Sequence, residues 1–462
     1  MKNEWLGLAA LGAVVSAGAG GVVLTGCGDD TVLALPDGGT DGSVSFDAPP
    51  YEAGNGDGGE GNDGQVGADA GDGGDAQGST PARLLLSFNG STQSELVAFG
   101  LQSGTIDGFY VYPGFIGTTF VTPNSPWLLE QASDVVARLD PLMPWQVQSS
   151  WSVALNDYAA DAGYSSPYSD PDGIVVGAGT KTYVLRYTRN LMAVLDSSQV
   201  VDGGAPTKTI DLSSELQADG DGYVEMTAGY YDSTTQRVYV LLANIDRFDV
   251  ASDGYTLLCA PTSPTIVAID TTSDTLVDLN PDGGSMGWTL PGYDPAFSPS
   301  AMVYDGPNDR LLVLQSGCNQ SDGDGGAGPL VQREIDAISL TDGTAQKLVD
   351  LTAAAFPSGL YYVDAQHVIV QLDTAYMWDP SSSTLGPAIP NAPQTFSLDG
   401  QGNLVGITQP IAADGGIGPW TVVSVSIADG GVTTLGTNPF PADDAGGVGP
   451  GFVSGAQLWP AP

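Results

Sequence analysis

Basic residues are scarce in this chain, and their scarcity limits the partners that it can have. Lys and Arg together number 12 against 54 Asp and Glu, histidine occurs once, and the formal net charge is −42. Proteins bind nucleic acids and anionic lipid surfaces through clusters of Lys and Arg that neutralise phosphate groups. We therefore expect no nucleic-acid partner.

The single histidine, His367, restricts the catalytic chemistry. Ser-His-Asp and Cys-His catalysis and multi-histidine metal sites all depend on histidine, and the pattern around His367 predicts an ordinary strand residue. The sequence also has no Gly-rich phosphate loop, basic patch or paired-Cys zinc motif. Glycoside hydrolysis needs only two carboxyl groups, so the abundant Asp residues leave it open.

Glycine, proline and apolar residues are plentiful. The chain has 64 Gly and 32 Pro, and 42% of its residues are hydrophobic. This composition is too rich in breakers for a mainly helical protein and too apolar for a disordered one. Because 462 residues exceed what one hydrophobic core usually organises, we expect many short strands in a repeat array, one very large domain or several domains.

The N-terminus has the features of an exported lipoprotein. An apolar, small-residue stretch over residues 6–23 has the length and character of a secretory signal. It ends in Leu24-Thr25-Gly26-Cys27, which resembles the lipobox of bacterial lipoproteins; a signal-anchor helix is the alternative. The resemblance implies that residues 1–26 are a signal peptide and that lipidated Cys27 anchors the protein in a membrane. Gly28, which stands where Asp retains many lipoproteins at the inner membrane, implies an outer-membrane location, periplasmic or surface-exposed.

Residues 27–81 read as the lipidated Cys and a disordered acidic tether. From Gly28 to Thr80 the chain has 12 acidic and no basic residues and is rich in Gly, so repulsion and backbone freedom keep it extended. The Asp-Gly runs lack the regular spacing of calcium-binding loops. We expect no cofactor, with calcium as the alternative.

A repeat dominates residues 82–462. Short apolar segments recur about every 54 residues, each followed by a turn rich in Asp, Ser, Thr or Gly. The seven copies are Glu95–Leu101, Asp134–Asp140, Asn190–Asp196, Thr265–Thr271, Glu334–Leu340, Thr374–Pro380 and Thr421–Ile427. Further β-rich segments lie before and after most copies, which gives four strands per unit.

One unit, Thr265–Asn280 (TIVAIDTTSDTLVDLN), resembles the YVTN-type repeats of bacterial β-propellers, which are related in form to NHL and WD40-like repeats. The resemblance implies an all-β propeller, most simply of seven four-stranded antiparallel blades; six or eight blades and a two-domain β protein are the alternatives. The N-terminal unit lacks a first strand, and Gly451–Trp459 reads as that strand. The ring would therefore be closed by the C-terminal strand joining the N-terminal blade.

The long connections predict where a site would lie. Those between strands two and three, and between strand four and the next blade, emerge on one face, and several are long in this chain. Cys259 and Cys318 fall in two such loops of neighbouring blades, and an exported protein would join them in a disulfide; two separate thiols are the alternative. The loop Ala154–Asp172 combines aromatic rings with carboxyl groups that suit a sugar or a cation: Asp157, Tyr158, Asp161, Tyr164, Tyr168, Asp170 and Asp172. A metal in the turn of residues 219–222 is a weaker alternative.

These observations favour a monomeric, lipid-anchored propeller that binds a protein or glycan without catalysis. The alternatives are an envelope hydrolase or lyase acting on a carbohydrate or lactone, and a scaffold in outer-membrane assembly. Carboxyl groups that converge with perturbed pKa values would favour the enzyme. A broad, open face would favour the binding module.

Overall fold

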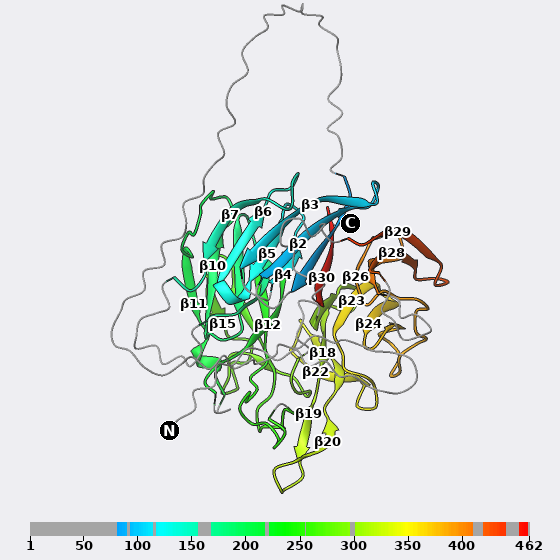
Figure 1. The fold of residues 1–462 in the computed structure, drawn as a ribbon. Helices are drawn as coiled ribbons and strands as arrows, with labels where there is room; N and C mark the ends of the chain where they lie inside the picture. Colours follow the sequence, from blue (N-terminus) through cyan, green and yellow to red (C-terminus); the bar gives the residue numbers. More distant parts are fainter. Residues whose placement is uncertain are drawn as a thin grey trace, which may run out of the picture.

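The computed structural model describes residues 81–89, 93–113, 117–155, 168–217, 221–254, 256–295, 301–409, 419–439 and 452–460. In these residues, seven antiparallel sheets follow one another along the chain and form the blades of a seven-bladed β-propeller (Figure 1). The seven-bladed ring predicted from the repeat is confirmed. The described residues contain no helix that is long and apolar enough to cross a membrane.

Blades 1 to 3 each have four strands, which are named in order from the axis of the ring outward. Blade 1 consists of β30 (Phe452–Trp459), β1 (Arg83–Asn89), β2 (Gln93–Gly100) and β3 (Thr105–Pro113). Blade 2 consists of β4 (Gly117–Val121), β5 (Pro126–Glu130), β6 (Val135–Leu139) and β7 (Val147–Ser152), with the 3-10 turn η1 (Gln131–Ser133). Blade 3 consists of β8 (Pro171–Val176), β9 (Lys181–Arg186), β10 (Leu191–Asp196) and β11 (Lys208–Asp211).

Blades 4 and 5 carry additions to this plan. Blade 4 consists of β12 (Met226–Asp232), β13 (Arg237–Leu242), β14 (Thr265–Asp270) and β15 (Thr275–Val277), and β16 (Trp288–Thr289) also pairs with β14; η2 (Ser213–Glu215) precedes the blade. Blade 5 consists of β17 (Met302–Asp305), β18 (Arg310–Gln315), β21 (Glu334–Ser339) and β22 (Ala345–Asp350), with η4 (Gly306–Asn308). The hairpin of β19 (Cys318–Ser321) and β20 (Ala327–Val331) interrupts blade 5 and projects from the ring at the bottom of Figure 1.

Blade 6 departs from the four-strand plan. It pairs β23 (Gly359–Asp364), β24 (His367–Gln371) and β25 (Ala375–Trp378), whereas blade 7 has β26 (Thr395–Leu398), β27 (Asn403–Thr408), β28 (Thr421–Ser426) and β29 (Val432–Thr437). The outer edge of β25 is covered by irregular chain: Met377 N donates to Pro387 O, and Gly386 N donates to Met377 O. Pro387 has no backbone N–H to give to a ladder, which explains why no fourth strand forms.

The seven repeated segments are the third strands of the blades, and the turns after them have a local cause. The Oδ1 atom of Asp270 accepts hydrogen bonds from Thr272 N at 2.8 Å and Ser273 N at 2.9 Å, and Asp196 Oδ1 accepts one from Ser198 N at 3.0 Å. Such side chain-to-backbone bonds stabilise tight turns. The sequence pattern therefore marks where each third strand ends.

Apolar side chains fill the spaces between blades. The largest cluster spans blades 4 to 6 and includes Leu241, Leu312, Ile335 and Val370, all fully buried. Each sheet packs against the two neighbouring blades, so both of its faces are buried. This explains why the strand sequences are continuous apolar runs.

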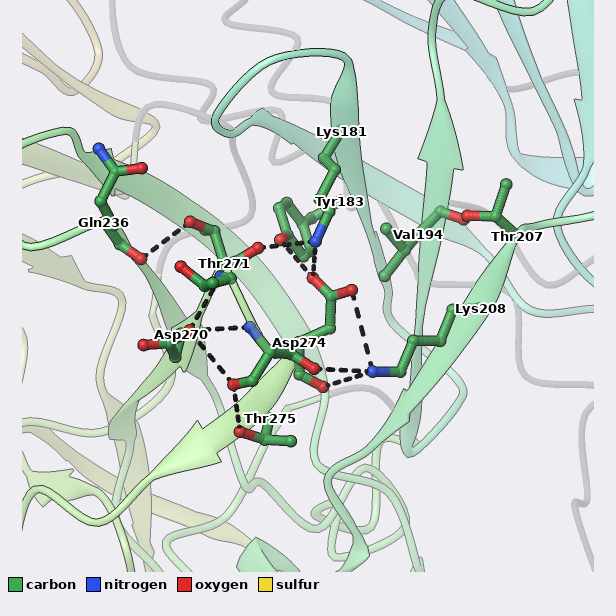
Figure 2. Close-up of polar contacts among 12 residues, drawn as sticks. Lys181, Tyr183, Val194, Thr207, Lys208, Gln236, Asp270, Thr271, Asp274 and Thr275 are labelled. Atoms are coloured by element: carbon green, nitrogen blue, oxygen red, sulfur yellow. Dashed lines mark hydrogen bonds and ion pairs between the residues drawn. The ribbon is translucent and has the colours of Figure 1, made fainter.

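A polar contact also joins blades 3 and 4, as Figure 2 shows. Asp274, in the turn before β15, accepts hydrogen bonds from Lys181 Nζ and Tyr183 OH of blade 3, both at 2.8 Å. Lys208 Nζ lies 3.8 Å from its other oxygen. Two of the few lysines of the chain thus converge on one carboxylate, which links blades 3 and 4.

The ring is closed as the sequence predicts. β30 pairs with β1 along its length, with Leu85 opposite Gln457 and Leu86 opposite Ala456. The Trp459 side chain is 3% exposed, and its Nε1 atom donates a hydrogen bond to Pro141 O of blade 2 at 2.7 Å. The C-terminal strand therefore joins blade 1 to the rest of the ring.

Connections between strands two and three, and between successive blades, share one end of the ring, which we call the long-loop face. Two of them form a satellite sheet: Leu258 pairs with Asn319 of β19, which pairs with β20. A disulfide joins Cys259 to Cys318, with their Cα atoms 5.0 Å apart. This is the pairing that the sequence predicts, and it ties the insertions of blades 4 and 5 together.

Candidate functional site

Three successive blades place an acidic residue at the same structural position. Asp170, Glu225 and Asp294 precede the innermost chain of blades 3, 4 and 5 at the long-loop face. Their backbone carbonyls accept hydrogen bonds from the residue that follows the second strand of the same blade: Tyr187 N at 2.8 Å, Ala243 N at 2.9 Å and Ser316 N at 2.6 Å. The repeat of the fold therefore brings three carboxyl groups to the start of three neighbouring inner strands.

All three residues adopt the left-handed backbone region. Their φ angles are 51° for Asp170, 43° for Glu225 and 55° for Asp294. A non-glycine residue in this region costs on the order of 1 kcal/mol, and such strain concentrates at functional sites.

We call these three acids, with Asp134, Asp172 and the arginines at 189 and 247, the axial cluster.

Arg247 is the arginine of the cluster that faces two carboxyl groups. Its Nε atom is 2.6 Å from Asp221 Oδ2 and 3.7 Å from Glu225 Oε1. Its guanidinium carbon is 4.6 Å from the centre of the Tyr223 ring and 5.5 Å from that of Tyr187. Ion pairing and cation–π contacts together hold the guanidinium in one orientation.

Asp134 links blade 2 to blade 3. Its Oδ1 atom accepts hydrogen bonds from Ser169 N at 2.6 Å, Ser169 Oγ at 2.7 Å and Asp170 N at 3.2 Å. Arg189 Nη1 donates to Tyr168 O at 2.9 Å. These bonds fix residues 168–170, the end of the long loop between blades 2 and 3, to Asp134 and Arg189.

Burial shifts the proton affinity of these carboxyl groups upward. It raises the pKa of Asp170 to about 6, with Arg247 opposing the shift and Asp134 adding to it. It raises the pKa of Asp294 to about 8 against the opposing charge of Arg333. The pKa of Asp172 is also raised, by burial and by Asp170. The cluster therefore holds carboxyl groups of unequal acidity, an arrangement typical of sites that bind or transfer protons.

The structure places two residues of the predicted ligand loop, Asp170 and Asp172, in this cluster, and the carbonyl of Tyr168 bonds to Arg189 of the cluster. Gln131 Nε2 donates to Asp172 Oδ1 at 3.3 Å, and Asp172 Oδ2 is shielded from solvent without a partner among the described residues. The other members of the predicted set, Asp157, Tyr158, Asp161 and Tyr164, lie outside the described residues, as does Cys27.

Two exposed aromatic residues are sequence neighbours of the cluster, Tyr168 two positions before Asp170 and Phe248 directly after Arg247. Tyr168 is 43% exposed and Phe248 is 52% exposed. The guanidinium carbon of Arg247 lies 5.9 Å from the centre of the Phe248 ring. The cluster thus combines flat apolar surfaces with fixed charged and polar groups.

Sequence reasoning missed Glu225, Arg247 and Asp294. A local signal was present for Asp294. Like the predicted Asp170, it is followed by Pro at the end of a long loop, and Pro disfavours the helical region for the residue before it. Arg247 offered no such signal, because its partners come from separate loops.

The residues of the cluster come from blades 2 to 5 and their connections. In the described residues, every buried polar or charged side chain belongs to blades 1 to 5 or their connections, and none comes from blades 6 and 7.

His367, the first residue of β24, is exposed and bonded through Nδ1 to Asp364 Oδ1 at 2.9 Å. In the part of the chain that the structure describes, no group of three or more His, Cys, Asp or Glu side chains is arranged to hold a metal ion.

No protein-family model matches the chain, and no curated protein matches it. Among solved structures it is similar to the periplasmic gluconolactonase of Pseudomonas aeruginosa, with 12% identity over 82% of this chain and 99% of that one and a TM-score of 0.47. It is also similar to a gluconolactonase from Xanthomonas campestris (12% identity, 71% and 88% covered, TM-score 0.36) and to the Dos1 propeller (8% identity, 76% and 75% covered, TM-score 0.41). At these identities the likeness concerns the fold alone.

Proposed function

We propose that the axial cluster binds a polyhydroxylated ligand of the carbohydrate class. The observation that carries this proposal is the exposed ring of Phe248, which lies against Arg247 next to fixed carboxyl groups, with the exposed side chain of Tyr168 two residues before Asp170. A sugar presents an apolar face that packs on aromatic rings and hydroxyl groups that donate to carboxylates. Phe248 would take the first, and Asp170 and Asp172 the second.

We also propose that the protein carries this site at the cell envelope, held by a lipid on Cys27. The support is the lipobox-like segment and the acidic stretch after it, which would keep the propeller away from the bilayer. Mass spectrometry of the N-terminal peptide from membrane-derived protein tests the anchor. A peptide that starts before Cys27, or an unmodified Cys27, would overturn it.

The binding proposal predicts that a matching oligosaccharide raises the thermal unfolding midpoint of the full-length chain. A ligand present at 100 times its dissociation constant stabilises the native state by about 2.7 kcal/mol. Phe248→Ala should weaken the binding about tenfold, because it removes the exposed ring on which the apolar face of the sugar would pack. Isothermal titration calorimetry against a panel of neutral and acidic envelope-type glycans measures both effects.

Phe109→Ala is the matched control. Phe109 is 39% exposed, but it lies on β3 at the outer edge of blade 1. It should bind the same glycan with unchanged affinity. If no glycan binds, or if both variants bind as the unmodified chain does, the carbohydrate site is wrong and a protein partner or a scaffold role becomes the hypothesis to test.

A second function, hydrolysis of the bound carbohydrate or lactone, is favoured by the unequal acidity of the cluster. At neutral pH Asp294, with a pKa of about 8, is mostly protonated, whereas Asp170, with a pKa of about 6, is mostly ionised. A proton donor and a proton acceptor in one site are what acid–base hydrolysis requires. Product analysis of the glycans that bind would detect turnover, and Asp294→Asn should abolish it.

A further inference from the structure

Arg333, which immediately precedes β21, is fixed by three separate contacts at the long-loop face. Its Nε atom donates to Ser316 O at 2.8 Å, and its Nη1 atom donates to Ala354 O at 2.9 Å. Its guanidinium carbon lies 5.5 Å from the centre of the Phe356 ring. The plane of the guanidinium is therefore set before any ligand arrives.

Arg333 forms no ion pair with a described carboxylate, unlike three of the eight arginines of the chain. Arg83, Arg247 and Arg310 each form an ion pair of 2.6–2.8 Å with an Asp. No described carboxylate lies within 4.0 Å of Arg333, and no described residue accepts a hydrogen bond from its Nη2 atom. The Nη2 atom of a guanidinium that is otherwise fixed is therefore available to a ligand.

Arg333 is linked to the axial cluster through one residue. Ser316 accepts the bond from Arg333 with its carbonyl and donates its own N–H to Asp294 O at 2.6 Å. Asp294, when it is ionised, is also the acidic group whose charge acts on Arg333. Burial raises the pKa of Asp294 to about 8, so at neutral pH it leaves most of the charge on Arg333 uncompensated.

We propose that Arg333 binds an anionic group of the ligand, so that the axial cluster selects a sugar carrying a carboxylate or a phosphate. This inference rests on the proposed function. A planar guanidinium binds both groups through paired, charge-assisted hydrogen bonds. Arg333 is half-buried, and partial exclusion of water strengthens such a contact.

The test compares matched sugars on one protein. The full-length chain is titrated calorimetrically with glucose, glucuronate and glucose 6-phosphate, with galactose and galacturonate, and with neutral and uronate-containing oligosaccharides. We expect the acidic member of a pair to bind at least tenfold more tightly than the neutral one. Comparing glucuronate with glucose 6-phosphate identifies which anion is preferred.

Two substitutions then assign the preference to Arg333. Arg333→Gln should reduce the ratio of acidic to neutral affinity to about one, whereas Arg333→Lys should keep part of it because the charge remains. The ratio is measured on a single variant, so a general loosening of the fold cancels. Arg237→Gln, at the start of β13 on the opposite face, is the control and should leave the ratio unchanged.

The outcomes separate the two proposals. Equal binding of acidic and neutral sugars, or a ratio that survives Arg333→Gln, overturns the role of Arg333 and leaves the carbohydrate site intact. No binding by either member of any pair overturns the carbohydrate site and the role of Arg333 with it.

Discussion

Replacing Trp459 by Ala should lower the free energy of unfolding by about 3–5 kcal/mol, the range for removing a large buried aromatic side chain. Trp459 ends the strand that closes the ring and is 3% exposed. It packs with Leu85 of blade 1 and Leu128 of blade 2, and its Nε1 atom bonds to Pro141 O. The substitution removes an apolar contact and a hydrogen bond where the first and last described strands of the propeller pair.

Chemical denaturation of the full-length chain measures this effect. Phe109→Ala, on an exposed part of blade 1, should change the free energy of unfolding by less than about 0.5 kcal/mol. A Trp459 variant as stable as the Phe109 variant would show that the C-terminal strand does not hold the ring closed.

Raising the pH from about 4 to about 8 should lower the stability of the folded chain by several kcal/mol. Burial, and then the charge of Glu334, raise the pKa of Asp336 to about 8, and burial raises that of Asp294 to about 8. The unfolded chain ionises these groups near their ordinary value of 3.8, so between the two values the folded state binds more protons. Stability then falls as pH rises, by about 1.4 kcal/mol for each unit of pKa difference.

Asp336→Asn isolates this effect from the general repulsion of a chain with a net charge of −42. Asp336 is fully buried, and Gly292 N donates to its Oδ2 atom at 3.1 Å. The neutral variant should lose part of the pH dependence and should be more stable than the unmodified chain at pH 9. Unfolding free energies from pH 4 to pH 9 test it.

Asp364→Asn is the control for the pH experiment. Asp364 is exposed and its pKa is lowered, chiefly by its hydrogen bond with His367, so solvent screens its contribution. The control should keep the pH dependence of the unmodified chain. An Asp336 variant with the same pH dependence as this control would show that Asp336 ionises normally in the folded state.

The fold could be predicted from the sequence because its signals are local and repeated. Each third strand is a short apolar run that ends in a turn with its own side chain-to-backbone bonds, as at Asp270. The spacing of the repeats can therefore be recognised even where the repeats share few identical residues. The closing strand was recognisable because the first blade lacked one. Blade 6 was harder, because irregular chain around Pro387 replaces the strand that the repeat predicts.

The candidate site was only partly predictable, because it is built across blades. Tyr168, Asp170 and Asp172 could be found as aromatic and acidic residues in one long loop. Arg247, by contrast, reaches Asp221, Tyr187 and Tyr223 from another loop, and no spacing along the chain predicts such a contact. The raised pKa values arise from burial by several blades, which only the assembled ring produces.

The pairing of β30 with β1 also sets an order of events during folding. β1 begins at residue 83 and β30 at residue 452, so most of the chain is synthesised between the two partners. Until the C-terminal strand emerges, the inner edge of β1 has unpaired N–H and C=O groups, and such edges can pair with other chains. Ring closure is therefore a late, long-range step, and any delay in completing the chain extends the time during which the nascent protein can aggregate.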